Sequence, residues 1–388
     1  MKVLFVNRWV GRRRGGSETY ILELARLLKA RGHEVSVVTS AGKLVEAFPP
    51  GIEVYQLPHN RREGDYSDVS DTRTLVFASL FVLRAGLKMS TIWNRQNRPF
   101  DVILVHSATE AALMWFLRPI LRVPYVYVFA GYSRREARIA KCSNLQLSLS
   151  HHVQECVWQD FGYRPVVIPV GTDVKRFGLR VSQVEARQHL GLPRGGFIVL
   201  TVCSLVPHKD LDTLIAAADL LGGRLPGLLV VVVGDGPERS RLARVIQSQN
   251  LEDRVSLAGP VESELLPFFY CAANVFALTE VNAGFSGGIV FLEAMSAGVP
   301  IIATTVGGIP ETVEGVGALV PPRNPERLSD AILGLAHNET LRYDMKQKGL
   351  EKVKSLDWDT LIERYEGALR SAIANYRSGQ GLSSLPLS

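Results

Sequence analysis

Three short segments carry residue types that bind phosphates and hydroxyl groups. Gly15 and Gly16 stand just before a helical pattern, and glycines let a backbone approach a ligand where helix amides attract anions. Lys209 lies in the loop CSLVPHKD ahead of a second helix, where its ammonium can hold a phosphate. Taken singly, the first segment fits a tight turn and the second a solvated surface lysine.

The third segment is the most informative one. A Gly-rich turn, residues 282–288, enters the apolar run IVFLEAM, which contains Glu293. The first amides of a helix have no partner within it, so they can donate to a ligand. A carboxylate among apolar residues is costly to bury without partners, so we expect Glu293 to face hydroxyl groups. An exposed helical glutamate is the alternative, and the apolar neighbours weaken it.

These segments follow apolar runs that are typical of buried strands. Runs at 2–7 and 33–39 enclose a helical pattern, which makes a βαβ unit. In the second half, apolar runs alternate with helical patterns; they lie at 197–202, 228–233, 255–257, 275–278 and 301–304. The pattern predicts two doubly wound α/β domains that meet near residues 169–173. Ligands of such sheets bind beyond the carboxyl ends of the strands, so a cleft between two facing Rossmann-like domains is expected.

Composition excludes several classes of protein. The 388 residues suit two domains, and the four cysteines form no CxxC pair, which argues against a zinc site or disulfide framework. The carboxylates Asp65, Asp68 and Asp71 lie in a polar loop and are better read as solvated than as a metal cage. The longest apolar run, 75–83, is too short to span a bilayer. We expect a cytoplasmic protein, at most peripheral on the cytoplasmic membrane face.

Charge is divided unevenly along the chain. Residues 1–168 hold 23 Lys and Arg against 14 Asp and Glu, whereas residues 169–388 hold 21 against 24. The excess suggests an anionic partner for the first half. No nucleic-acid motif is present, so we expect no nucleic acid, and an anionic membrane surface fits. The apolar stretch 75–87 with Arg84, Lys88 and Arg95 has the character of an interfacial helix.

Four blocks, in this order and spacing, resemble the family 4 glycosyltransferases, also called glycosyl transferases group 1. They are GGSETYILELARLLKARGHEVSVVT, LVPHKDLDTLIAA, VVVGDGPERSRLARV and GIVFLEAMSAGVPIIATTVGGIPETV. The resemblance covers nearly the whole chain. It implies a GT-B fold and retaining transfer from a nucleotide diphosphate-sugar. The acceptor is then a glycan, a lipid-linked molecule or a small molecule, and neither a metal nor a cofactor is expected.

The resemblance also implies roles for single residues. Lys209 would bind the donor diphosphate and Glu293 the ribose hydroxyls. The other expected substrate contacts are Gly15, Gly16, His106, Ser204, Gly288, Ile289 and Val290. Residues 1–168, completed by a last helix at about 359–376, would hold the acceptor. Residues 169–358 would hold the donor, and 379–388 would be a disordered tail.

Three positions depart from the family pattern. Ser204 stands where many members have Arg, and Ala130 where many have His. A first acidic residue is missing at Phe285, or at Ala283 if two residues are inserted. These departures leave open a catalytically weak or inactive GT-B subunit, and less readily an epimerase or hydrolase. The sequence names neither the sugar, the nucleotide base nor the acceptor.

Overall fold

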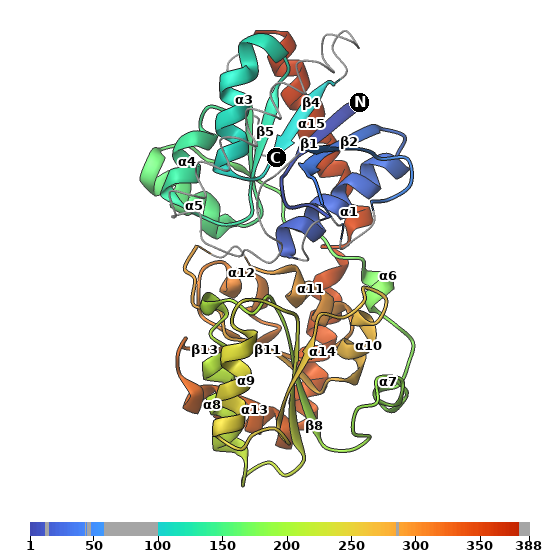
Figure 1. Ribbon diagram of the computed structural model, residues 1–388, viewed down its shortest axis with the longest axis vertical. Coiled ribbons are helices and arrows are strands. Elements are labelled where there is room, and N and C mark those ends of the chain that lie inside the picture. Colours follow the sequence, from blue (N-terminus) through green and yellow to red (C-terminus); the bar gives the residue numbers. More distant parts are fainter. Residues whose placement is uncertain (12–14, 43, 45–47, 58–99, 285–286, 380–388) are drawn as a thin grey trace. The chain divides into compact units, whose positions relative to one another are not determined.

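The computed structural model describes residues 1–11, 15–42, 44, 48–57, 100–284 and 287–379, and every structural statement below refers to them. The chain divides into two compact units, Met1–Pro169 with Asp359–Ser388, and Val170–Trp358. Each unit holds one parallel sheet with helices around it (Figure 1).

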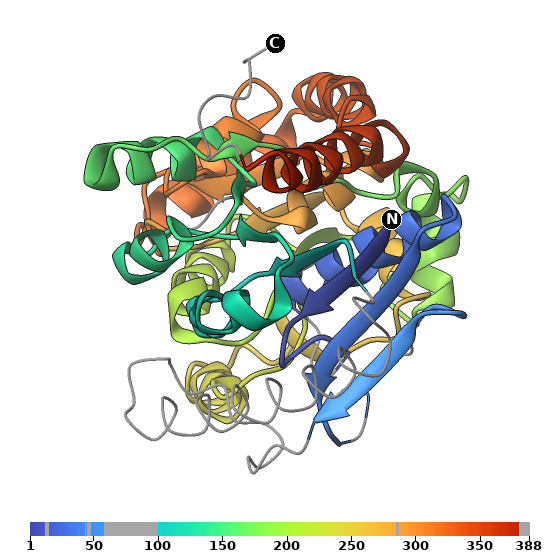
Figure 2. The ribbon, with the colours of Figure 1, turned by 90° about the horizontal axis from the view of Figure 1, so that it is seen from above.

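The first unit contains a seven-stranded sheet in the order β3-β2-β1-β4-β5-β6-β7. Its strands are β1 (Lys2–Val6), β2 (Glu34–Ser40), β3 (Glu53–Leu57), β4 (Val102–Val105), β5 (Tyr125–Phe129), β6 (Leu145–Ser148) and β7 (Val166–Val167). Its helices are α1 (Gly16–Ala30), α3 (Ala108–Leu121), α4 (Arg134–Ala140), α5 (His151–Phe161) and nearly all of α15 (Trp358–Arg377). Figure 2 shows β1 and β2 side by side, with Lys2 paired to Glu34 and Val6 to Val38.

Apolar composition explains the central strands of this unit. The strands β4 and β5, with sequences VILV and YVYVF, are buried at every residue, as parallel strands covered on both faces must be. The run 75–83 and the basic residues after it lie outside the described residues. So do Asp65, Asp68 and Asp71.

The last helix, α15, packs on the first unit. The Tyr365 hydroxyl donates to the carbonyl oxygens of Ile168 and Pro169, each at 3.1 Å. At the edge of the helix, Glu366 Oε1 accepts hydrogen bonds from Arg31 Nε at 2.9 Å and His33 Nε2 at 2.7 Å. The chain therefore returns to its first unit after completing the second.

Glu366 supplies a test of this packing. Burial raises the pKa of its carboxyl, but the hydrogen bonds from Arg31 and His33 outweigh burial and leave the pKa below its usual value of 4.5. A carboxyl with a depressed pKa stabilises the fold above its unfolded-state pKa and loses that effect as the pH falls through its folded-state pKa. Glu366→Gln should lower the free energy of unfolding by about 1 kcal/mol at pH 7.

Urea unfolding at pH 7 and pH 3 measures this effect, and the variant and the original chain should converge at pH 3. Glu363→Gln is the matched control, because Glu363 contacts the same Arg31 at 3.6 Å from a side chain that is 73% exposed. An exposed pair of this kind contributes little. An equal loss in both variants would contradict a special role for Glu366.

The second unit contains a six-stranded sheet in the order β10-β9-β8-β11-β12-β13. Its strands are β8 (Phe197–Val202), β9 (Leu228–Val233), β10 (Val255–Gly259), β11 (Val275–Leu278), β12 (Ile301–Thr304) and β13 (Gly317–Val320). Its helices are α6 (Val174–Phe177), α7 (Gln183–His189), α8 (Leu211–Leu221), α9 (Arg239–Ser248), α10 (Leu266–Ala272), α11 (Ile289–Ser296), α12 (Ile309–Val313), α13 (Pro325–His337) and α14 (Glu339–Lys354), with a 3₁₀ turn at Pro207–Lys209.

This sheet reverses its strand order between β8 and β11. The connection from β8 runs to β9 on one side, whereas β11 pairs with β8 on the other. Such a switch point leaves room for a ligand beyond the carboxyl ends of the two strands. Lys209 follows β8 and Glu280 follows β11, so both lie at this point.

No helix among the described residues is long and apolar enough to cross a membrane.

Candidate functional site

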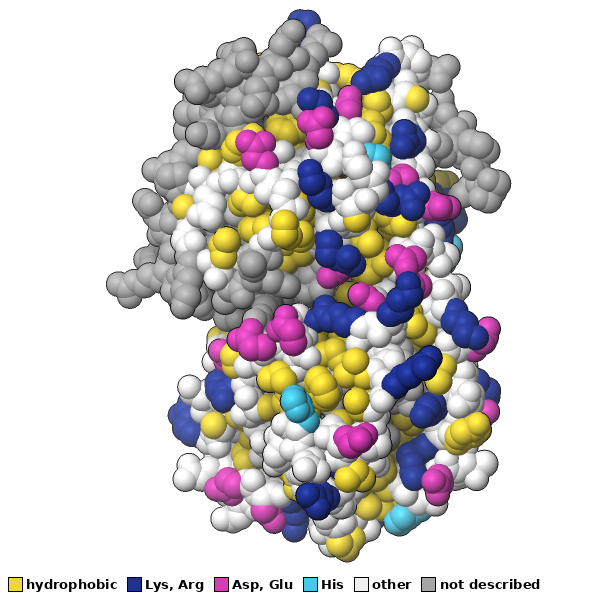
Figure 3. Space-filling model, turned by 90° about the vertical axis from the view of Figure 1, so that its right-hand side faces the viewer, with side chains coloured by type: hydrophobic (Ala, Val, Ile, Leu, Met, Phe, Trp, Pro, Cys, Tyr) yellow, Lys and Arg dark blue, Asp and Glu magenta, His cyan; other side chains and the backbone are white. Residues whose placement is uncertain are grey.

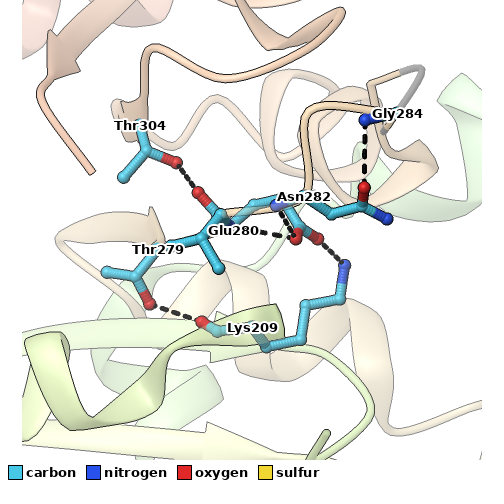
Figure 4. Close-up of polar contacts among 7 residues, drawn as sticks. Lys209, Thr279, Glu280, Asn282, Gly284 and Thr304 are labelled. Carbon is cyan, nitrogen blue, oxygen red and sulfur yellow. Dashed lines mark hydrogen bonds and ion pairs between the residues drawn. The ribbon is translucent and has the colours of Figure 1, made fainter. Parts of the chain in front are cut away.

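Lys209 forms a buried ion pair at the carboxyl edge of the second sheet. Its Nζ donates to Glu280 Oε2 at 2.5 Å, and the two side chains are 12% and 0% exposed. The loop after β8 carries the lysine and the end of β11 carries the glutamate (Figure 4). The ammonium is thus fixed in place and is not a solvated surface group.

Glu280 also holds the loop that follows it. Its Oε1 accepts hydrogen bonds from the amides of Val281 at 3.0 Å and Asn282 at 2.8 Å. The Asn282 side chain in turn accepts from the Gly284 amide at 2.9 Å. Because both carboxylate oxygens are acceptors, one side chain connects the lysine to the Gly-rich turn (Figure 4).

Two threonines fix the backbone around this pair. The Thr279 hydroxyl donates to the Lys209 carbonyl oxygen at 2.8 Å, and the Thr304 hydroxyl donates to the Glu280 carbonyl oxygen at 2.6 Å. Thr279 follows β11 and Thr304 ends β12, so adjacent strands anchor the site (Figure 4). Both threonines are almost fully buried.

The GDGP turn supports the lysine loop from the neighbouring strand. A Cβ at Gly234 would lie 1.9 Å from the Cys203 carbonyl oxygen, and the residue has φ +133°. The Leu205 amide donates to the Asp235 carbonyl oxygen at 2.9 Å. The Asp235 carboxylate accepts from the Gly236 amide at 2.9 Å. Asp235 therefore stabilises a turn.

Helix α11 begins where the Gly-rich turn ends. Gly288 is its N-cap, with φ −97° and ψ 148°, and as a glycine it has no side chain that could cap the helix. The amides of the first turn, Ile289 and Val290 among them, have no acceptor within the helix. These residues are only partly buried, so the amides lie where a phosphate or hydroxyl oxygen can reach them.

Glu293 is buried on the next turn of α11. It is 5% exposed, and its Oε2 accepts a hydrogen bond from the Tyr270 hydroxyl at 2.7 Å. Burial raises the pKa of Glu293 to about 7, against the lowering effects of the Tyr270 hydrogen bond and the Arg176 charge. The residue is not an exposed helical glutamate.

Cys203 directly follows β8. Burial raises the pKa of its thiol to about 11, so the thiol is uncharged at neutral pH. The charges of Lys209 and Glu280 also act on the thiol, and the thiol acts on Tyr270, the partner of Glu293.

Family models match most of the chain. The model described as "Glycosyl transferases group 1" matches residues 182–352, and the "Glycosyl transferase 4-like domain" matches residues 15–155. The chain belongs to this family of glycosyltransferases. Each of the two matches lies within a different unit of the structure. The fold is the GT-B fold of the structural neighbours.

This glycosyltransferase has relatives of known activity along almost its whole length. A GDP-mannose-dependent alpha-(1-6)-phosphatidylinositol monomannoside mannosyltransferase of Mycobacterium tuberculosis is 27% identical, covering 95% of this chain and 98% of its own. A D-inositol 3-phosphate glycosyltransferase of Salinispora tropica is 28% identical, covering 94% and 82%. A sucrose-phosphate synthase of Thermosynechococcus elongatus has a TM-score of 0.81 at 23% identity, covering 96% and 99%.

The glycosyltransferase carries three of the expected residues in its first unit. Gly15 caps α1, and a Cβ there would lie 2.4 Å from Glu18 Oε2, whereas a Cβ at Gly16 would meet open space. His106 is 9% exposed, and neither ring nitrogen has a hydrogen-bond partner among the described residues. Burial lowers the pKa of His106 to about 3, so its imidazole is neutral.

Sequence reasoning missed Glu280. From the sequence, the first acidic residue of the family pattern is missing at Phe285, or at Ala283 if two residues are inserted, and Phe285 lies outside the described residues. The buried carboxylate beside Lys209 instead stands directly after the strand VFAL and Thr279. The sequence feature that could have indicated Glu280 is an acidic residue two positions after a wholly apolar strand. Ser204 contributes a carbonyl oxygen that accepts from the Val206 amide at 3.0 Å.

No cluster of three or more His, Cys, Asp or Glu side chains that could hold a metal ion occurs in the described ranges.

Proposed function

We propose that this glycosyltransferase binds its nucleotide diphosphate-sugar on the second unit, through Lys209, the first amides of α11 and Glu293. The observation that carries the proposal is the Lys209 ammonium, held by Glu280 at the switch point of the sheet. An ammonium has three N–H donors and can hold Glu280 and phosphate oxygens at the same time. Its positive charge would oppose the negative charge that develops on the leaving diphosphate.

We further propose retaining, metal-independent transfer. The two buried carboxylates of the site are both engaged, Glu280 by Lys209 and Glu293 by Tyr270. Their engagement favours a displacement in which the donor phosphate, rather than a protein carboxylate, takes the acceptor proton. Lys209 and the helix amides would supply the charge stabilisation that a metal supplies elsewhere. Turnover should then persist when a metal chelator such as EDTA is present.

The proposed acceptor is anionic and carries an inositol phosphate group. The Mycobacterium tuberculosis relative is named for transfer to a phosphatidylinositol mannoside, and the Salinispora tropica relative for an inositol phosphate. Residues 1–168 hold 23 Lys and Arg against 14 Asp and Glu, which complements such an acceptor. The Mycobacterium tuberculosis relative is named as dependent on GDP-mannose, which supports GDP-mannose as the first donor to test.

A transfer assay tests the function directly. GDP-mannose is supplied with a phosphatidylinositol mannoside, with D-inositol 3-phosphate, or without acceptor, and release of GDP is followed with and without EDTA. Release that depends on an acceptor and survives EDTA supports the proposal. The absence of any nucleotide-sugar binding in a thermal-shift panel would contradict it, since a ligand at 100 times its dissociation constant stabilises by about 2.7 kcal/mol.

We also propose that the first unit meets an anionic membrane surface through one face of α3. Trp115, Phe116 and Ile120 are 53%, 72% and 53% exposed. Arg118 and Arg122 are exposed on the same helix end. Exposed aromatic and aliphatic groups beside arginines are typical of an interfacial helix. On the face shown in Figure 3, by contrast, basic and acidic side chains are interspersed.

Vesicle sedimentation should show binding that rises with the phosphatidylglycerol fraction and falls with salt. Each basic residue near an anionic surface adds about 1 kcal/mol, so Arg118→Glu with Arg122→Glu should weaken binding by about tenfold or more. Trp115→Ala with Phe116→Ala should weaken it as well. Trp158→Ala is the control, because Trp158 is 43% exposed on α5. Equal sedimentation with phosphatidylcholine and phosphatidylglycerol vesicles would rule out this surface.

A further inference from the structure

Tyr270 is a buried tyrosine whose hydroxyl donates a hydrogen bond to Glu293. Its ring is fully buried, and its hydroxyl lies 2.7 Å from Glu293 Oε2 and 3.3 Å from the Val290 carbonyl oxygen. Phe177 meets the ring edge-on at 5.7 Å, and Phe276 lies tilted at 5.7 Å. The ring therefore has no room to turn away, and its hydroxyl stays between the two acceptors.

A hydroxyl can donate one hydrogen bond through its proton and can also accept a hydrogen bond through its oxygen. When Glu293 is ionised, the Tyr270 hydroxyl donates to Oε2. When Glu293 is protonated, the carboxyl proton can be accepted by the Tyr270 oxygen while the hydroxyl proton turns to the Val290 carbonyl oxygen. Oε2 has a partner in both forms, but the hydrogen bond to the ionised carboxylate is charge-assisted and therefore the stronger one, so Tyr270 favours the ionised form. No hydrogen bond to Glu293 Oε1 occurs among the described residues, so that oxygen is left for a substrate hydroxyl.

We propose that Tyr270 is a positioning residue that orients Glu293 and keeps its carboxylate ionised for the ribose hydroxyls of the donor. This inference rests on the proposed function, in which Glu293 holds the ribose. An ionised carboxylate has only acceptor oxygens, so it can hold two hydroxyl donors at once. In a protonated carboxyl, one oxygen carries the proton, so fewer acceptor positions remain for the hydroxyls of the donor. Donor affinity should therefore follow the ionisation of Glu293.

The charged surroundings of Glu293 are few. Among the described residues, the elements with the most contacts to α11 are α6, α10, α14 and β12. Arg176 of α6 and Tyr270 of α10 act on the carboxyl, and both lower its pKa. From α14, Lys346 faces Gly298, beyond the other end of α11. The strand β12, with sequence IIAT, has no titratable group. Arg176 is therefore the one charge acting on this carboxyl from the described residues of these elements.

The test measures the affinity for a nucleotide sugar between pH 5.5 and pH 9. GDP-mannose is the probe, because both its phosphates are esterified and lack the second ionisation near pH 6 of a terminal phosphate. With the pKa of Glu293 near 7, affinity should fall as the pH drops through that value. Tyr270→Phe removes a hydrogen bond that favours the ionised form of Glu293. In this variant the pH at which affinity falls should therefore be about one pH unit higher. Affinity should then be about fivefold lower at pH 7, and the two curves should meet near pH 9.

Two further variants separate positioning from a structural effect. Glu293→Gln should weaken binding and remove this pH dependence, and Tyr270→Phe should change nothing further in that background. Tyr127→Phe is the matched control, since Tyr127 is equally buried in the first unit and its hydroxyl has no hydrogen-bond partner in the part of the chain that the structure describes. Its curve should follow that of the original chain.

The outcomes are distinguishable. If the original chain binds no nucleotide sugar, the proposed function fails. If it binds and Glu293→Gln weakens binding, but the Tyr270→Phe curve superimposes on the original one, only the role of Tyr270 is overturned. Should Tyr270→Phe not fold, an affinity of the original chain that is constant across pH 5.5 to 9 overturns the inference by itself.

Discussion

Replacing Lys209 by methionine is expected to lower the kcat/KM of sugar transfer about ten- to a hundredfold, while the fold survives. Hydrogen bonds to charged groups are worth roughly 1.5–3 kcal/mol, and the effect should be strongest where charge develops on the leaving diphosphate. Methionine keeps the length of the side chain and removes its charge. The transfer assay measures the loss, and thermal unfolding reports the fold.

Glu280→Gln should lower kcat/KM by a similar factor, because this position accepts from three N–H groups. They belong to Lys209, Val281 and Asn282, and they occupy both carboxylate oxygens. A glutamine has one acceptor oxygen and one donor nitrogen, so either the ammonium or the loop amides must face a donor. If Glu280 acts through Lys209, the double variant should be no worse than Lys209→Met alone.

The comparison of Lys209→Met with the double variant does not need Glu280→Gln to fold alone. The double variant removes both charges, whereas Lys209→Met leaves the buried Glu280 carboxylate with only the amides of Val281 and Asn282 as partners. Asp212→Asn is the control. It makes the same charge change three residues from Lys209, but breaks an exposed pair with Arg241. Losses that multiply in the double variant, or an equal loss in Asp212→Asn, would argue against coupling of Glu280 to Lys209.

Gly234→Ala is expected to destabilise the second unit by roughly 3 kcal/mol or more. Gly234 has φ +133°, a conformation that side chains rarely adopt, and such strain alone costs of order 1–3 kcal/mol. The added Cβ would also lie 1.9 Å from the Cys203 carbonyl oxygen. Relief requires the loop after β8 to move, and that loop leads to Lys209, so transfer should fall as well.

Urea unfolding and the transfer assay together measure this change. Gly334→Ala is the matched control: it lies in α13, its Cβ would meet open space, and alanine favours a helix by about 0.5–1 kcal/mol. The same substitution should thus have opposite signs at the two glycines. Unchanged stability in Gly234→Ala would show that the loop yields at little cost, and the close packing of Gly234 would then not position Lys209.

The strands of the second unit were readable from the sequence because their signal is local. Apolar runs at 197–202, 228–233, 275–278 and 301–304 coincide with β8, β9, β11 and β12. A buried parallel strand must be apolar on both faces, and that requirement is met within a few residues. Short elements with mixed burial, such as β3 at Glu53–Leu57, gave no comparable pattern and were missed.

The candidate site was only half readable, for a related reason. Glu293 was singled out because a carboxylate in an apolar run is unusual in itself, whereas Lys209 was singled out only by the resemblance of its loop to the family pattern. Their partners, Glu280 and Tyr270, are 71 and 23 residues away along the chain. Nothing local marks which distant side chain will complete a buried polar group.

The amino-acid sequence alone determined the α/β class, the turns that follow the strands and the family to which the chain belongs. Each of these depends on residue types and spacing over short stretches. Tertiary structure determined that Lys209 is paired with Glu280, and that Glu293 is buried with a raised pKa. Charge, burial and hydrogen bonding depend on neighbours that the sheet brings together, because parallel strands place their carboxyl ends at one edge whatever their distance along the chain.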